Sequence, residues 1–176
     1  MDEVVPHPSR GLGSNTARGN LSHGDLPMKN NHDIKTLNSL IETTLDSADG
    51  YAEAAKDAKS ESLVSLFRER ANERRQVAST LQQRVRLLGG DPADDGTMAA
   101  SAHRMFVNLR TSLTSNDNKA VVDEVERGED HLKSKFEHAM NDKDISADTE
   151  AVIADLYTSV RNGHDQMRDI KRAFHG

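Results

Sequence analysis

Five residues in this chain have side chains that could bind a metal ion as a group. They are Glu53, Glu73, Glu126, Glu129 and His164. Carboxylate oxygens and imidazole nitrogens are ligands for iron and manganese in proteins. A carboxylate that faces the interior of a protein is costly unless a cation or a hydrogen-bond donor compensates it. Metal binding is therefore the chemistry that this set could support, provided that the fold brings the side chains together.

Segment 121–140 indicates most clearly that one of these carboxylates faces the core. Apolar residues recur there at spacings of three, four and seven, as in a helix that buries one face: Val121, Val125, Leu132, Phe136 and Met140. Gly128 and Glu129 lie three and four residues after Val125, where apolar residues are expected. A buried glycine costs roughly 1 kcal/mol of helix propensity relative to alanine. Both residues therefore indicate a special site at this level of the helix.

Four long amphipathic helices would have to position the candidate residues. The apolar period predicts these helices at about residues 33–58, 61–88, 118–140 and 147–173. Asn31 or Asp33, Ser60 and Ser146 are available as N-caps of the first, second and fourth helices. Gly89, followed by Gly-Asp-Pro, is expected to end the second helix. A shorter amphipathic segment at 97–114 connects the second long helix to the third.

The lengths of these helices and connections predict an all-α fold, a ferritin-like four-helix bundle. The first two helices and the last two are each joined by a short turn, so each pair forms an antiparallel hairpin. The segment between the hairpins spans roughly 25–27 Å if helical, enough for a crossover along the bundle. Two hairpins joined by one long crossover define the ferritin-like topology. Counting residues from the helix ends places the five candidates within about two helical turns of one level.

The composition excludes several classes of protein. A length of 176 residues suits one domain with a sizeable core. The chain has no cysteine, which excludes disulfides, thiol catalysis and thiolate metal sites and fits a cytoplasmic protein. The formal net charge of −6 argues against nucleic acid as a partner, and no apolar run is long enough to span a membrane. A homodimer remains open as a partner.

Residues 1–28 are expected to lie outside the folded domain. Residues 1–27 contain three of the four prolines and four of the eleven glycines, and they show no apolar period. Such a segment has too little apolar surface to pack and is predicted to be disordered. The stretch that begins at Met28 reads like a natural start, so the preceding residues form a leader or a tag-like extension. The bundle domain is expected at residues 29–176.

Four stretches of the chain resemble an uncharacterised bacterial family, a domain of unknown function. They are GYAEAAKDA (50–58), LFRERANERRQVASTLQQRVRLLGGDP (66–92), ERGEDHLKSKFEHAM (126–140) and HDQMRDIKR (164–172). The resemblance covers most of residues 33–173. It implies a ferritin-like four-helix bundle and no particular activity, so a function has to be argued from the residues.

The ligand pattern of ferritin-like di-iron proteins is incomplete in this chain. Those proteins take one glutamate from each of two helices and a Glu-x-x-His pair from each of the other two. No Glu-x-x-His occurs here, because Glu73 is followed three residues later by Gln76 and His164 is preceded three residues earlier by Arg161. An arginine offers positive charge and no lone pair. Arg161 stands where the glutamate of a Glu-x-x-His pair would be. There its positive charge would pair with the carboxylates in place of a metal ion.

Two functional classes remain. The first is a non-catalytic bundle, acting through its surface as a dimer or as a stress-associated accessory protein, with no cofactor. In it, Arg70, Arg74 and Arg161 neutralise Glu73, Glu129 and their neighbours in a charge-paired polar layer. The alternative is a metal-binding oxidoreductase or storage protein with a degenerate carboxylate and histidine site for iron or manganese. The missing Glu-x-x-His pairs favour the first class, and no catalytic residue is predicted.

Overall fold

The computed structural model describes residues 26–96 and 118–176, and within these ranges the chain forms four α-helices and no strand. The helices are α1 (Leu26–Asp57), α2 (Glu61–Leu87), α4 (Asn118–Met140) and α5 (Ala147–His175). The prediction of an all-α chain is confirmed. The predicted leader up to residue 25 and the predicted amphipathic segment at 97–114 lie outside the described residues.

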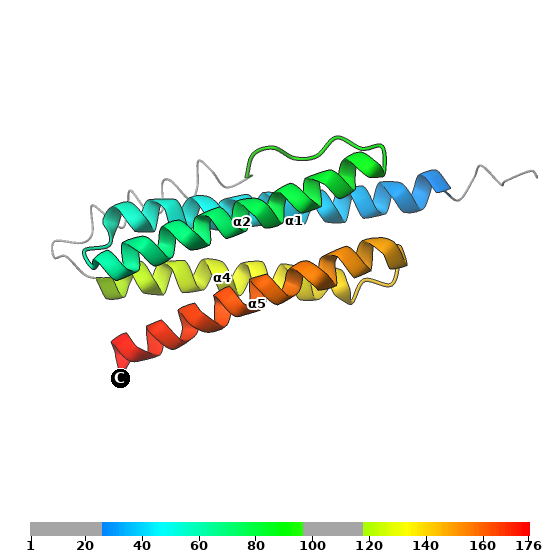
Figure 1. The fold of residues 1–176 in the computed structure, drawn as a ribbon. Helices are drawn as coiled ribbons and strands as arrows, with labels where there is room; N and C mark the ends of the chain where they lie inside the picture. The colour runs from blue at the N-terminus through cyan, green and yellow to red at the C-terminus, as the bar shows by residue number, and fades with distance from the viewer. Residues whose placement is uncertain (1–25, 97–117) are drawn as a thin grey trace, which may run out of the picture.

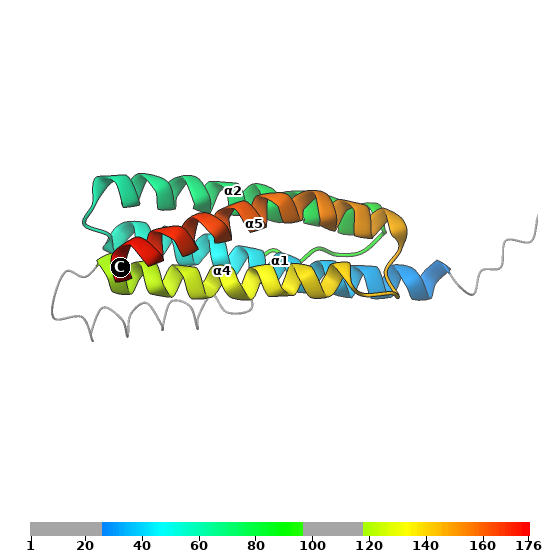
Figure 2. The same ribbon diagram turned by 90° about the horizontal axis from the view of Figure 1, so that it is seen from below.

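The four helices form two antiparallel hairpins that pack side by side (Figure 1). α1 packs against α2 and α4, and α5 packs against α4 and α2. The colour gradient in Figures 1 and 2 shows that α2 and α4 run in the same direction, opposite to α1 and α5. Parallel second and third long helices require a connection that returns along the bundle, which is the ferritin-like topology predicted from the turn lengths.

The helix ends follow the expected capping residues in part. Ser60 lies at the N-cap position of α2, but its side chain makes no capping hydrogen bond. Ser146 caps α5, because its Oγ accepts a hydrogen bond from the backbone N–H of Thr149. Gly89 has φ of +80°, a left-handed conformation that glycine adopts without strain after the end of α2. α1, however, begins at Leu26 rather than at residue 33. Asp33 does not cap α1, since its carboxylate accepts hydrogen bonds from Ser146 and Thr149 instead.

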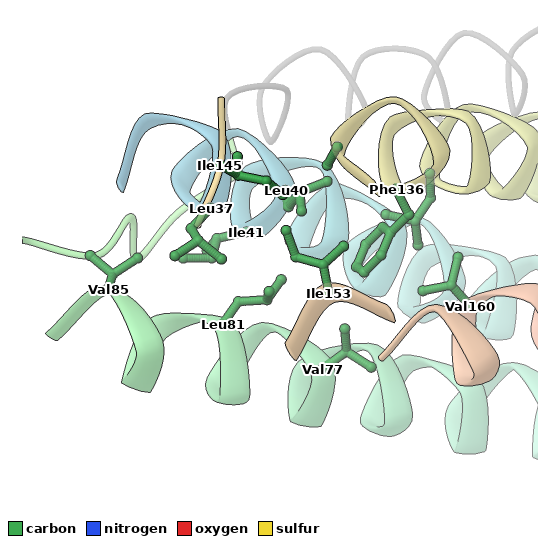
Figure 3. Packing of buried hydrophobic residues seen from close by; sticks show 12 residues of the cluster. Leu37, Leu40, Ile41, Val77, Leu81, Val85, Phe136, Ile145, Ile153 and Val160 are labelled. Carbon is green, nitrogen blue, oxygen red and sulfur yellow. The ribbon is translucent and has the colours of Figure 1, made fainter. Parts of the chain in front are cut away.

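The core consists of two apolar clusters at opposite ends of the bundle. The first, shown in Figure 3, includes Leu37, Leu40, Ile41, Val77, Leu81, Val85, Leu132, Phe136, Ile153 and Val160. The second includes Tyr51, Ala54, Phe67, Ala71, Val121, Val125 and Met167. On every helix, a few residues separate the members of one cluster from those of the other. The fully buried Thr44, Arg74 and Glu129 fall in this interval, so a polar layer divides the core.

The helices are amphipathic rather than uniformly apolar. In the part of the chain that the structure describes, none of them is both long enough and apolar enough to cross a membrane.

Candidate functional site

A buried ion pair lies at the centre of the polar layer. Arg74 of α2 and Glu129 of α4 both have side chains with no exposed surface. Arg74 Nη2 donates to Glu129 Oε2 at 2.5 Å, and Arg74 Nε donates to Glu129 Oε1 at 3.2 Å. This two-point contact between guanidinium and carboxylate is the strongest geometry available to such a pair. The carboxylate predicted to face the core is therefore compensated by an arginine from a neighbouring helix.

The other two helices complete the contacts of this ion pair. Ser47 of α1 donates a hydrogen bond from its hydroxyl to Glu129 Oε1 at 2.7 Å. On α5, the carbonyl oxygen of Val160 lies 3.4 Å from Arg74 Nη2, and the carbonyl oxygen of Ser159 lies 3.5 Å from Arg74 Nη1. One ion pair thus makes polar contacts with all four helices, and it links the two hairpins through the interior.

A glycine on α5 provides the space for the guanidinium. Gly163 is buried, and a Cβ atom added to it would lie well inside the contact distance of Arg74 Nη2 and 3.0 Å from Glu129 Oε2. Gly128 on α4 is different, because it is exposed and a Cβ atom there would meet no other atom within 4 Å. The expectation that Gly128 is buried is wrong. The glycine that the polar layer requires is Gly163.

The electrostatics of the layer favour the charged form of Arg74. Burial alone would lower the pKa of Arg74, but the carboxylate of Glu129 outweighs it and raises the pKa above its ordinary value. Tyr51, next to the layer, is 1% exposed. Burial, followed by the negative charge of Glu129, raises the pKa of the Tyr51 phenol well above 10. The Tyr51 hydroxyl lies near Glu129 without a well-formed hydrogen bond to any described residue. The Tyr51 hydroxyl therefore lies inside the bundle and not at its surface.

A second carboxylate, Glu73, lies at the edge of the same layer. Its carboxylate pairs with Arg70 one turn earlier on α2 and accepts a 2.5 Å hydrogen bond from the hydroxyl of Ser159 on α5. Arg70 also donates two hydrogen bonds to the side-chain oxygen of Gln166. Burial would raise the pKa of Glu73, but the hydrogen bond from Ser159 and the charge of Arg70 together lower it. Glu73 is therefore held as an anion by the chain's own groups.

The remaining candidate ligands have other partners. Glu126 of α4 forms a 2.7 Å ion pair with Lys171 of α5, and Glu53 forms a 2.5 Å ion pair with Lys56 on its own helix. His164 Nε2 lies 2.7 Å from Asp130 Oδ1, and its Nδ1 lies 3.1 Å from Asp165 Oδ1. The structure therefore brings Glu73 and Glu129 together around Arg74 and Ser159. It directs the other three candidates toward different groups.

The identity of the central arginine differs from the expectation. Arg161 was expected to stand where a metal ligand would be, but it is exposed on α5. Arg74 takes the interior position. It continues the buried stripe of α2, since it follows Ala71 by three residues and precedes Val77 by three. This spacing was the signal in the sequence that could have singled out Arg74 among the three arginines.

Comparison with known proteins agrees with this fold. A search of curated proteins finds no significant match. Among solved structures, the chain is similar to a dodecameric thioferritin, the bacterioferritin-related protein from Bacteroides fragilis. The TM-score is 0.67 at 16% sequence identity, and the similarity covers 85% of this chain and 91% of that chain. At this identity the similarity shows a shared ferritin-like fold.

The sequence itself matches a family model over a large part of the bundle. The match covers residues 32–142, which contain α2, α4 and nearly all of α1, and the family is described as a domain of unknown function, DUF2383. The family that the four sequence stretches resemble is thereby confirmed at this level. This chain belongs to the DUF2383 family and adopts a four-helix, ferritin-like fold.

Proposed function

We propose that this protein is a non-catalytic ferritin-like bundle in which a charge-paired polar layer stands in place of a di-metal centre. The observation that carries the proposal is the buried Arg74–Glu129 pair. The guanidinium occupies the position next to Glu129 that a cation would need, and it contributes no lone pair to a metal. The bundle would then act through its outer surface and its assembly, and no reaction would take place at its centre.

A count of charges in the layer supports this proposal. Two guanidinium groups, Arg70 and Arg74, face two carboxylates, Glu73 and Glu129, and each carboxylate is engaged by an arginine and by a serine hydroxyl. The layer is therefore neutral without a metal ion. A divalent ion beside the fully buried Arg74–Glu129 pair would add two positive charges to the interior, which is strongly unfavourable without additional anions. These residues do not fit a dinuclear metal centre.

The other candidate ligands support the same interpretation. Glu126 and Glu53 are each paired with a lysine, and binding of a metal would first have to break these ion pairs. Both ring nitrogens of His164 face carboxylates of exposed or half-buried aspartates. A set of ligands that is already compensated in this way has little free-energy gain from a metal ion.

The alternative function is a metal-binding oxidoreductase or storage protein with a degenerate site for iron or manganese. The observation in its favour is the similarity of the fold to a protein described as a thioferritin. Because that protein is dodecameric, the similarity also suggests that this chain assembles with copies of itself, and a homodimer is the smallest such assembly. The two functions differ in whether the central carboxylates and His164 bind metal.

The experiment that separates them measures binding of manganese and oxidation of ferrous iron by the chelator-treated full chain. We expect Glu73→Gln and His164→Gln to leave the number of bound manganese ions and their affinity unchanged. We also expect the parent to oxidise ferrous iron in air no faster than buffer alone, and the exposed control variant Asp155→Asn to behave like the parent. If the parent oxidises iron rapidly and either Glu73→Gln or His164→Gln abolishes that activity, the centre is a working metal site and the proposal fails.

A further inference from the structure

A second group of polar side chains lies away from the central layer, at the end of the bundle that holds the α4–α5 turn. His32, near the start of α1, meets Asp142 and Asp144 of the turn between α4 and α5. One ligand atom from each of these three residues lies within 4.8 Å of the other two. In residues 26–96 and 118–176, this is the only group of three or more metal-binding side chains with such spacing. We call these three residues the end cluster.

The backbone around the end cluster is held in place by a separate, buried contact. The carboxylate of Asp33 has no exposed surface. It accepts hydrogen bonds from the backbone N–H of Ser146 at 3.0 Å, from the hydroxyl of Ser146 at 2.5 Å and from the hydroxyl of Thr149 at 2.6 Å. Asp33 and Ser146 adjoin the end cluster in sequence. The Asp33 contact therefore fixes the backbone of α1 near His32 against the α4–α5 turn, which carries Asp142 and Asp144.

Within the end cluster itself, the carboxylates outnumber the imidazole. His32 Nε2 lies 2.8 Å from Asp142 Oδ2, and the backbone N–H of Asp144 donates to Asp142 Oδ1 at 2.9 Å. The carboxylate of Asp144 makes no hydrogen bond or ion pair with a described residue. Two carboxylates thus lie beside one imidazole, which supplies at most one positive charge when protonated and none when neutral. Like charges at this separation favour the uptake of a cation.

We propose that the end cluster binds one divalent transition-metal cation such as zinc or manganese. One imidazole nitrogen and two carboxylate oxygens form a mixed donor set that suits these ions. Ligand atoms that share one such ion, at bond lengths of about 2.0–2.2 Å, lie roughly 3 Å apart. The His32–Asp142 distance of 2.8 Å already has this value. The Asp144 side chain is exposed, so it is free to rotate and complete the set. Water would fill the remaining positions.

The ion would connect α1 to the α4–α5 turn and thereby stabilise the bundle, by an amount that grows with the logarithm of the free ion concentration once that concentration exceeds the Kd. Binding at the end cluster is independent of the central layer. If the centre proves to bind metal, the end cluster can still bind its own ion. If the end cluster binds no ion, the proposal of a non-catalytic centre is unaffected.

The experiment titrates zinc and, separately, manganese into the chelator-treated full chain, with isothermal calorimetry and the melting temperature as readouts. We expect one ion per chain and a rise of the melting temperature in the parent. Asp144→Asn is the most informative variant, because its carboxylate has no partner in the described residues and its loss should not disturb the fold. Asp144→Asn, Asp142→Asn and His32→Gln should each weaken binding at least about tenfold.

Matched controls come from exposed residues of the same types elsewhere on the bundle. His138→Gln and Asp155→Asn should leave both the affinity and the stabilisation by metal unchanged, since neither residue is part of the end cluster. Far-ultraviolet circular dichroism in the presence of chelator shows whether each variant is folded. If the parent binds no ion, or if it binds one with the same affinity after all three substitutions in the end cluster, the proposal is wrong. Loss of binding in Glu73→Gln or His164→Gln alone would place the ion at the centre and would refute the end site as well.

Discussion

Replacing Gly163 by alanine is expected to destabilise the bundle, although alanine is the better helix former. In the interior of a helix, this change normally gains about 0.5–1 kcal/mol. At Gly163 the new methyl group would overlap the Arg74 guanidinium and press against Glu129 Oε2. The arginine chain is flexible, but its head group is buried and held by Glu129 at two points and by α5 carbonyl oxygens. The methyl group can therefore be accommodated only by weakening the buried ion pair.

The size of the effect follows from two opposing contributions. Removal of one partner from a buried ion pair costs about 3–5 kcal/mol, and a displaced pair loses a large part of that while keeping both charges. After subtraction of the gain in helix propensity, we expect a net loss of about 1–3 kcal/mol in the free energy of unfolding. For a chain of this length, that corresponds to a fall in melting temperature of about 2–12 °C.

The assay is urea denaturation monitored by circular dichroism, with Gly128→Ala as the matched control. Gly128 is also helical, but it is exposed and has free space at the Cβ position. Gly128→Ala should therefore stabilise the protein by about 0.5–1 kcal/mol. The two glycine substitutions should have effects of opposite sign.

A second background tests the cause of the destabilisation. In the double variant Arg74→Met with Glu129→Leu, the ion pair is replaced by apolar side chains, and Gly163→Ala should cost much less than in the parent. If Gly163→Ala has the same cost in both backgrounds, the overlap with Arg74 is not the reason. If it stabilises the parent as much as Gly128→Ala does, the explanation from the buried pair is refuted.

Three further predictions concern single side chains of the polar layer. Arg74→Ala should lower the free energy of unfolding by about 3–5 kcal/mol, because it leaves Glu129 buried without its cation. Arg161→Ala should change it by no more than about 0.5 kcal/mol. If urea denaturation shows similar effects for the two variants, Arg74 is not the central arginine. Tyr51→Phe should preserve the stability or raise it by up to about 1 kcal/mol, because the buried hydroxyl makes no well-formed hydrogen bond to a described residue, and a clear loss of stability would show that it makes one. The lowered pKa of Glu73 means that its stabilising contribution is present above its unfolded-state pKa of about 4.3 and is lost as the pH falls through the lower folded-state value. The difference in unfolding free energy between the parent and Glu73→Gln should accordingly shrink as the pH falls below the unfolded-state pKa, and a constant difference would argue against the lowered pKa.

The helices and their order could be predicted from the sequence because the information is local. Apolar spacing along α4 and α5, the capping side chain of Ser146 and the left-handed Gly89 all act within a few residues. The short turns and the long connection then allow few topologies. The start of α1 was missed because Asp33 is a residue type that often caps helices. Its carboxylate instead accepts hydrogen bonds from Ser146 and Thr149, more than a hundred residues away. The neighbouring sequence does not show whether an aspartate caps its own helix or bonds to a distant segment.

The sequence by itself determined that charged residues would interrupt the apolar stripes at a common level, because each stripe is periodic and each interruption is visible in it. Only the tertiary structure decided how those charges pair. Glu126 and Glu129 are three residues apart and both buried, yet one meets Lys171 and the other meets Arg74. Long side chains reach across to other helices, and their partners depend on the rotation and offset of each helix against its neighbours. For the same reason Gly163, which has no side chain at all, acquires its importance only when the guanidinium of another helix occupies the space beside it.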